Sequence, residues 1–330
     1  MKHTDIKQIL TKPEEYFGKS VTVCGWIRSF RDSKNMAFIA LNDGTTLSHL
    51  QIVIDKSSVT LPDGATRVGS SVKIEGTAVK SLNKNQAVEV NAAAITLLGD
   101  CPLDYPIQKA KTSLDYLRTL PHLRVRTNTF NAVFRIRSKI SAAIHRYFQE
   151  RDYIYAHTPI ITGSDCEGAG KIFQVTTLGF APEYKTAEEY NAADFFGQSA
   201  GLTVSGQLEG EVMATAFGKI YTFGPTFRAE NSNTTRHAAE FWQIEPEVAF
   251  AELDDIIEIA TEFIKYIIKA VIDECPDELA LLERFYEKGL VAKLQKVVDD
   301  EFARVDYTEA IEILKKSGKQ FVYPVEWGLD

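Results

Sequence analysis

Short runs of β-branched and aromatic residues, separated by turn residues, dominate the first third of the chain. Such residues favour strands because their side chains pack well on a pleated surface. Asn42-Asp43-Gly44, which follows one of these runs, is typical of a tight turn between strands. The runs span residues 21–27, 37–41, 50–54, 71–76 and 87–90. Five short strands over residues 20–100 predict a small closed β-barrel, and a small β-sandwich is the alternative.

Helical periodicity replaces this pattern in the second part of the chain. Apolar residues recur at steps of three and four over residues 128–151 and again over residues 253–272, which predicts two amphipathic helices. We expect a further helix over residues 278–300. Between the first two helices, residues 217–223 and 240–250 have the composition of strands. Helices and strands in this order predict a mixed α+β domain.

Prolines mark the division between the two patterns. Three of them fall between positions 102 and 121, in a segment that is typical of a linker. We therefore expect a barrel domain over residues 1–103, a linker over residues 104–125 and an α+β domain over residues 126–330. A length of 330 residues suits about two domains.

Composition and cysteine usage exclude several classes of protein. With 45% apolar and 25% charged residues, the chain is globular rather than disordered or collagen-like. No apolar run approaches the roughly 20 residues that a membrane-spanning helix needs, and no apolar signal-like segment follows the first residues. The four cysteines form no CxxC pair, which argues against a zinc site or a disulfide framework. We expect a cytoplasmic protein without membrane contact.

Charge is distributed unevenly along the chain. The net charge is −8, yet residues 1–151 carry 22 Lys and Arg against 13 Asp and Glu, whereas residues 152–330 carry 15 against 32. A basic first half in an acidic protein favours a polyanionic partner for that half. Chance placement of solvated charges is the equal alternative.

Residues 227–241 carry the most specific combination of side chains, in a segment between two predicted strands. Arg228 and Glu230 are two residues apart and therefore share one face of a strand. The Arg228 guanidinium can bind a phosphate through two parallel hydrogen bonds, and Phe241 offers a flat apolar surface to a purine. A nucleotide-binding hairpin is one interpretation, and an exposed hairpin with a structural Arg–Glu pair is the other.

The complete string, FRAENSNTTRHAAEF, resembles motif 2 of the class II aminoacyl-tRNA synthetases, in particular the subgroup for aspartate, asparagine and lysine. This motif is the ATP-binding hairpin of the family. The resemblance implies that Arg228 is the catalytic residue and holds the α-phosphate together with the amino-acid carboxylate. Other side chains would contact the nucleotide, its outer phosphates and its adenine ring: Glu230, then Arg236 and His237, then Phe241.

A second segment agrees with this resemblance. Residues 128–161, a predicted helix followed by a strand that contains Pro159, resemble motif 1 of the same family. Motif 1 implies a homodimer interface built by this helix–strand element. From the residues alone, Pro159 is equally compatible with an ordinary edge strand.

The predicted barrel resembles the OB-fold anticodon-binding domain of the same subgroup. An aromatic ring on a barrel face provides a platform on which a base can stack, and arginines beside it hold the nucleic-acid backbone. The implied anticodon contacts are Arg28, Arg31, Phe38 and Gln51. Without the resemblance, Phe38 would be read as part of the barrel core.

The substrate pocket resembles the asparaginyl branch of the subgroup, as the string VSGQL at residues 204–208 indicates. Aspartyl enzymes carry a lysine where this chain has Gly210, and an aspartate where it has Glu245. The pocket thus loses a cation and keeps an acceptor, which favours asparagine as the substrate. The resemblance implies that Glu245 binds the side-chain NH₂, Gln207 the substrate amine or amide, and Glu167, in a glycine-flanked loop, the α-ammonium group.

The resemblance implies ATP-dependent ligation of asparagine to tRNA(Asn) through an asparaginyl-adenylate. The implied partners are tRNA(Asn), L-asparagine and ATP, with Mg²⁺ as the cofactor. Positioning and charge stabilisation by Arg228 and magnesium suffice for this chemistry, so that no protein nucleophile is required. The alternatives are an aspartyl-tRNA synthetase, including a non-discriminating one, and a non-catalytic tRNA-binding paralogue.

The resemblance stops before motif 3, the glycine-rich strand and helix that closes the class II catalytic domain. After residue 250 the glycines are isolated, at Gly289, Gly318 and Gly328. We expect the magnesium ligands beyond residue 330. The expected fold class is therefore an N-terminal OB-fold β-barrel plus an α+β class II synthetase catalytic domain, with an antiparallel sheet flanked by helices, that is incomplete at its C-terminus.

We predict that the isolated 330-residue polypeptide is inactive or nearly so, because motif 3 would supply the arginine that binds the γ-phosphate. Asparagine-dependent exchange of pyrophosphate into ATP measures this activity directly. Exchange at the rate of an intact class II synthetase would contradict the prediction.

Overall fold

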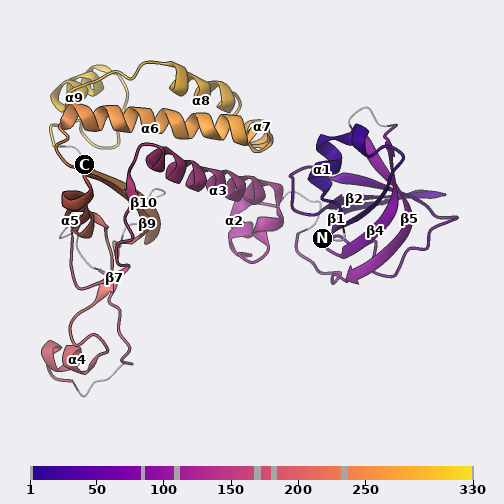
Figure 1. Cartoon of the computed structure of the whole chain (residues 1–330), viewed down its shortest axis with the longest axis horizontal. Helices are drawn as coiled ribbons and strands as arrows, with labels where there is room; N and C mark the ends of the chain where they lie inside the picture. The colour runs from indigo at the N-terminus through magenta and orange to yellow at the C-terminus, as the bar shows by residue number, and fades with distance from the viewer. Residues whose placement is uncertain are drawn as a thin grey trace. The chain divides into compact units, whose positions relative to one another are not determined.

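The structure is a computed structural model that describes residues 3–82, 86–107, 112–166, 172–179, 184–231 and 237–328. The chain forms two compact units (Figure 1). The first comprises residues 1–139 together with residues 272–291, and the second comprises residues 140–271 together with residues 292–330.

The first unit contains a closed five-stranded barrel, drawn in indigo to purple in Figure 1. Its strands are β1 (Ser20–Asp32), β2 (Met36–Asn42), β3 (Leu50–Asp55), β4 (Ser71–Lys80) and β5 (Val88–Gly99). Around the barrel the order is β1-β2-β3-β5-β4, in which β3 and β5 run parallel. The closed barrel confirms the sequence prediction and excludes the β-sandwich.

Alternating side chains of the strands form the barrel core. On β2, Ala37, Ile39 and Leu41 are fully buried, whereas the residues between them are partly exposed. Helix α1 (Ile6–Thr11), followed by the 3₁₀ turn η1 (Pro13–Glu15), adds Ile6 and Ile9 to the same core. Full burial of one such aliphatic side chain contributes roughly 1.5–3 kcal/mol, so that this core is a major stabilising term of the unit.

The segment between the barrel and the following long helix has structure of its own. It contains α2 (Leu114–Arg118) and the 3₁₀ turn η2 (Arg124–Arg126). Ser113 caps α2, since its Oγ accepts a hydrogen bond from the Tyr116 N–H at 3.2 Å. A small buried cluster holds the segment together: Cys101, Tyr105, Ile107 and Leu117. The domain boundaries at residues 103 and 125 stay a prediction.

The second unit is organised around a three-stranded sheet. Its strands β9 (Lys219–Phe227) and β10 (Glu240–Val248) pair antiparallel, and β6 (Ile154–Tyr155) runs parallel to β9. This pairing confirms the predicted hairpin. One face of the sheet packs on helices α3 (Asn128–Gln149) and α6 (Leu253–Glu274). The rings of Phe148 and Tyr221 stack there, with 4.6 Å between their centroids.

Both long helices agree with the apolar periodicity of the sequence, whereas the third predicted helix does not. Instead of one helix over residues 278–300, the chain forms α7 (Pro276–Phe285) and α8 (Leu290–Asp299). Gly289 lies between them with φ at 83°, a left-handed conformation that interrupts a right-handed helix. The prediction of a single helix was therefore wrong. The remaining elements are β7 (Ile161–Thr162), α4 (Ala187–Ala193), β8 (Gly201–Leu202), α5 (Gln207–Phe217) and α9 (Tyr307–Lys316).

Gly76 generates a testable prediction for the barrel. It lies where the pairing of β4 with β5 shifts register, and an added Cβ would overlap the Asn91 carbonyl oxygen and come within 2.9 Å of Val90 Cγ1. We expect Gly76→Ala to lower the free energy of unfolding by about 1–3 kcal/mol, as measured by urea denaturation. Gly224→Ala in β9 is the matched control, because its Cβ would meet no described atom within 4 Å. Equal destabilisation by both changes would contradict the steric explanation.

Candidate active site

The register of the β9–β10 hairpin places two of the predicted ATP-binding side chains, Arg228 and Phe241, on one face of the sheet. Phe241 pairs with Thr226, and the Arg228 N–H donates a hydrogen bond to the Ala239 carbonyl at 3.1 Å. Residues opposite each other in an antiparallel ladder share a face, and so do residues two apart on one strand. Arg228, Phe241 and Glu245 therefore lie on the same face, opposite the face that packs on α3 and α6.

Arg228 and Phe241 are in contact distance of one another. The Arg228 Cζ atom lies 5.5 Å from the centroid of the Phe241 ring, which is a cation–π arrangement. Both side chains are partly exposed, so that a planar, negatively charged ligand can reach them together. Glu230 and His237 are exposed residues on either side of the hairpin connection. Arg236 and Glu167 lie outside the described residues.

Glu245 is oriented by three hydrogen-bond donors. Its Oε2 accepts from the Thr222 hydroxyl at 2.7 Å and from the Gly206 N–H at 3.3 Å, and its Oε1 accepts from the Ser205 hydroxyl. Ser205 and Thr222 are buried, and a Cβ on Gly206 would lie 2.9 Å from Thr222 Cγ2, so these segments are closely packed. The carboxylate is consequently held in one orientation at the start of α5.

Gln207 lies at the first position of α5, directly after Ser205 and Gly206, which donate hydrogen bonds to Glu245. Its N–H donates to the Ser205 hydroxyl at 3.0 Å, and its Nε2 donates to Glu211 Oε1 at 2.9 Å. The Cys166 thiol is 3.9 Å from Gln207 Oε1. Because Cys166 directly precedes Glu167, the structure brings Gln207 close to the start of the loop in which the sequence places the α-ammonium contact.

Gly210 packs directly on the polar face of the hairpin. It is buried, and an added Cβ would lie 3.6 Å from Glu247 Cγ and 3.4 Å from Ile220 Cδ1. Glu247 is two residues beyond Glu245 and shares its face. Burial raises the pKa of Glu247 above its ordinary value, and the nearby charges of Glu211 and Glu245 raise it further.

The sequence prediction did not assign Ser205, Thr222 or Glu247 to the site. The spacing of Glu247 from Glu245 is a signal that places both on one strand face. No local signal identifies Ser205 and Thr222, since their hydrogen bonds to Glu245 span 40 and 23 residues of the chain. Only the packing of α5 against the hairpin reveals them.

The predicted anticodon contacts fall mainly on one outer face of the barrel. Arg31 pairs with Phe38, and its guanidinium carbon lies 4.4 Å from the ring centroid. Gln51 shares this face through its pairing with Ala40, two residues beyond Phe38. Gln51 Nε2 donates to Glu89 Oε2 at 3.2 Å, so that Glu89 joins the group although the sequence did not single it out.

Arg28 is set apart from these three residues by a β-bulge. The pairing of β1 with β2 shifts register between Ile27 and Ser29, which leaves Arg28 as the extra residue. A bulge turns the side chain of the extra residue away from the regular alternation. Arg28 Nη2 accordingly donates to Asn128 Oδ1 at 3.2 Å, and Arg28 does not lie with the other predicted anticodon contacts.

Exposed apolar side chains occur along the element that resembles motif 1. They are Val133 and Phe134 on α3, Ile154 on β6, and Ile160 and Ile161 at β7. Apolar surface of this kind is typical of a protein interface. In the described part of the chain, no helix combines the length and apolar character needed to cross a membrane.

Comparison with known proteins shows that two family models match most of the chain. Residues 113–326 match the family model of class II tRNA synthetases (D, K and N), and residues 21–98 match that of the OB-fold nucleic acid binding domain. The asparagine–tRNA ligase of Clostridium kluyveri is 49% identical over 338 residues, covering 100% of this chain and 72% of that protein. The asparagine–tRNA ligase of Clostridium tetani is 50% identical over 334 residues, with the same coverage.

Solved structures agree with the fold. The asparaginyl-tRNA synthetase of Pyrococcus horikoshii, complexed with asparaginyl-adenylate, superposes with a TM-score of 0.82 at 24% identity, covering 100% of this chain and 70% of that one. The aspartyl-tRNA synthetase of Entamoeba histolytica is less similar, with a TM-score of 0.68 at 21% identity, and covers 97% of this chain and 64% of that one.

The raised pKa of Glu247 predicts a dependence of stability on pH. The folded state binds the Glu247 proton more tightly than the unfolded state does. The stability that this proton contributes is present below the ordinary carboxyl pKa, and it is lost as the pH rises through the pKa of Glu247 in the folded protein. We expect Glu247→Gln to raise the free energy of unfolding at pH 7 by at most about 1 kcal/mol, since solvent screens the group. The difference should vanish near pH 4, as urea denaturation at both values would show. An equal effect at both values would contradict the electrostatic explanation.

Proposed function

The chain belongs to the class II tRNA synthetases of the aspartate, lysine and asparagine group, and we propose from this membership that it ligates asparagine to tRNA(Asn). The observation that carries the proposal is the hairpin face on which Arg228, Phe241 and Glu245 lie together. The relatives' names favour asparagine, and the chain spans 72% of their length. The aspartyl and non-catalytic alternatives are not favoured.

The proposed reaction has two steps, which need positioning and charge stabilisation more than a protein nucleophile. An oxygen of the asparagine carboxylate attacks the α-phosphorus of ATP, and the bond to the bridging oxygen breaks so that pyrophosphate leaves. A terminal ribose hydroxyl of tRNA(Asn) then attacks the carbonyl carbon of asparaginyl-adenylate, and AMP leaves. Arg228 would neutralise charge on the α-phosphate in the first step, while Phe241 stacks on adenine.

The rest of the hairpin connection would hold the ATP. Glu230 would contact the nucleotide, and Arg236 and His237 would bind its outer phosphates, as the resemblance to motif 2 implies. Magnesium would neutralise phosphate charge as pyrophosphate leaves. In the described ranges no group of three or more His, Cys, Asp and Glu side chains is arranged to hold a metal ion. We therefore assign no ligand to magnesium.

Glu245 is the residue we propose to distinguish asparagine from aspartate. A carboxylate offers about four acceptor positions, of which the hydroxyls of Ser205 and Thr222 and the Gly206 N–H use three. Oε1 accepts only from Ser205 among the described residues, and so it retains an acceptor position for the side-chain NH₂ of asparagine. The carboxylate of aspartate would instead face a like charge, a mismatch that can provide about 10⁴-fold discrimination.

The other amino-acid contacts follow the same reasoning. Gln207 would bind the substrate amine or amide, and Glu167 the α-ammonium group. Gly210 supports the preference for asparagine, because it places no cation beside Glu247. An enzyme with lysine at this position would bring a positive charge to the pocket, as an aspartate side chain requires.

The remaining partners are proposed from the surfaces that suit them. Arg31, Phe38 and Gln51 form a stacking and hydrogen-bonding face suited to anticodon bases. The exposed apolar residues of the 128–161 element support a homodimer. The four cysteines carry no disulfide, which suits the proposed cytoplasmic location.

Replacement of Glu245 tests the proposed function. We expect Glu245→Ala to lower kcat/KM for asparagine activation by roughly 100-fold in the full-length protein, because the side-chain NH₂ loses its acceptor. The preference for asparagine over aspartate should narrow as well. Pyrophosphate exchange with each amino acid measures both effects, and Glu258→Ala on the exposed side of α6 is the control. An unchanged preference would remove Glu245 from the specificity pocket.

A further inference from the structure

A large cavity lies within the first unit, and the described residues that line it include none of the β9–β10 hairpin. Its volume is about 880 Å³, which is in the range of small-molecule sites. The barrel strand β1, the segment over residues 42–49, η2 and the ends of α3 and α7 contribute to its wall. All of these segments belong to the same compact unit.

The cavity is positively charged in a protein that is acidic as a whole. Arg28 and Arg126 line it, and no Asp or Glu occurs among the described residues of its wall. Arg28 donates to Asn128 Oδ1 at 3.2 Å and Arg126 to the Tyr105 hydroxyl at 3.3 Å. Across the described ranges, neither guanidinium forms an ion pair. Arg28 is partly buried, whereas Arg126 is exposed. A guanidinium without a carboxylate partner is a group to which an anion binds readily.

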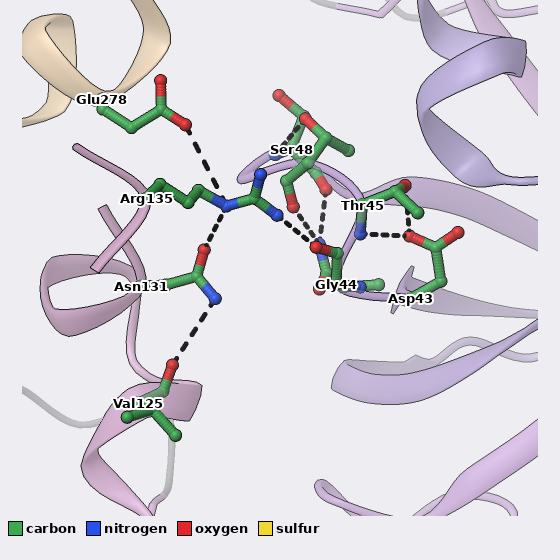
Figure 2. A network of polar contacts seen from close by, with 10 residues as sticks. Asp43, Gly44, Thr45, Ser48, Val125, Asn131, Arg135 and Glu278 are labelled. Atoms are coloured by element: carbon green, nitrogen blue, oxygen red, sulfur yellow. Dashed lines mark hydrogen bonds and ion pairs between the residues drawn. The ribbon is translucent and has the colours of Figure 1, made fainter. Parts of the chain in front are cut away.

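A third arginine of the same unit, Arg135, differs from Arg28 and Arg126 because it has a carboxylate nearby. Arg135 reaches from α3 to the Gly44 carbonyl of the segment beside β2, and it also donates to Asn131 Oδ1 at 2.7 Å (Figure 2). Its Nε lies 4.0 Å from Glu278 of α7, so that this arginine has a carboxylate nearby. Arg135 is a structural residue that connects the segments of the wall. Arg28 and Arg126 line the cavity and have no such carboxylate partner among the residues that the structure describes.

The wall also offers hydrogen-bonding and aromatic groups. His49 Nδ1 is buried and has no hydrogen-bond partner among the described residues. Burial lowers the pKa of His49, and the charge of Arg28 lowers it further, so His49 is neutral and can donate or accept one bond. Trp26 and Tyr286 line the same cavity, and the Tyr286 hydroxyl is 2.8 Å from Thr129 Oγ1.

We propose that this cavity binds a nucleoside phosphate, with the phosphate on Arg28 and Arg126 and the base on the aromatic wall. An inorganic anion alone would fill only a small part of 880 Å³. A ligand that combines negative charge with a flat aromatic ring matches both the guanidinium groups and Trp26. The proposed ligand is a free nucleotide. The described wall of the cavity contains no residue of the β9–β10 hairpin, and binding there does not depend on the ligase reaction.

Trp26 provides a direct reporter of binding. The chain has three tryptophans, and Trp242→Phe with Trp327→Phe leaves Trp26 as the only one. We expect AMP to quench its fluorescence saturably at micromolar to low millimolar concentrations. Inorganic phosphate should compete with AMP for this site. Arg228→Ala should leave the response unchanged, which separates the cavity from the proposed catalytic site.

Matched arginine variants test the role of charge. Arg28→Gln and Arg126→Gln should each raise the half-saturating AMP concentration by at least about tenfold, because each removes a charge-assisted contact. Arg124→Gln is the control: Arg124 lies in the same turn η2 as Arg126 but stacks on Phe130 and does not line the cavity. Circular dichroism would show that each variant is folded.

Unfractionated tRNA is the second probe, and it shows whether an RNA chain rather than a free nucleotide occupies the cavity. A response to AMP that is weakened by Arg28→Gln and Arg126→Gln supports the proposal. A response of Trp26 to tRNA alone, no response to AMP, or an equal loss of the AMP response with Arg124→Gln would overturn it.

Discussion

The antiparallel ladder between β9 and β10 is the constraint on which the proposed catalytic site depends. Because paired residues share a face, the register of this ladder determines which side chains lie on each of the two faces of the hairpin. Ile244 and Val248 point toward the aromatic core, while Arg228 and Phe241 lie on the opposite, open face. A slip of one residue would exchange the two sets. The core thus maintains the site geometry, since burial of the apolar face holds the register.

Neighbours from distant segments then give chemically equal side chains different properties. Glu245 receives hydrogen bonds from three donors, whereas Glu247, two residues further, is partly buried near other carboxylates and has a raised pKa. The arginines of the first unit differ in the same way. Arg135 has Glu278 nearby, and Arg28 has no ion-pair partner among the described residues. Residue type alone does not separate these roles, because the counter-charges come from other parts of the chain.

The sequence predicted the barrel strands, the two long helices and the β9–β10 hairpin because their signals are local. The structure contains the alternation of buried and partly exposed residues on β2, the two long helices α3 and α6, and the hairpin beside Arg228. The break at Gly289 was missed, since an isolated glycine is tolerated in many helices and only its positive φ shows the interruption. The bulge at Arg28 was missed as well, because a bulge exists only relative to the partner strand.

By itself the sequence determined the barrel strands, the two long helices and the family, since periodicity, turn residues and the motif 2 string are properties of consecutive positions. Strand pairing in the tertiary structure decided that the first strands form a closed barrel and not a β-sandwich. Tertiary structure alone decided which donors hold Glu245 and where the Arg28 side chain points. It also decided which cations share a cavity whose described wall contains no Asp or Glu. The physical reason is that hydrogen bonds and charges act over a few ångströms in space, and such distances join residues that the chain keeps tens of positions apart.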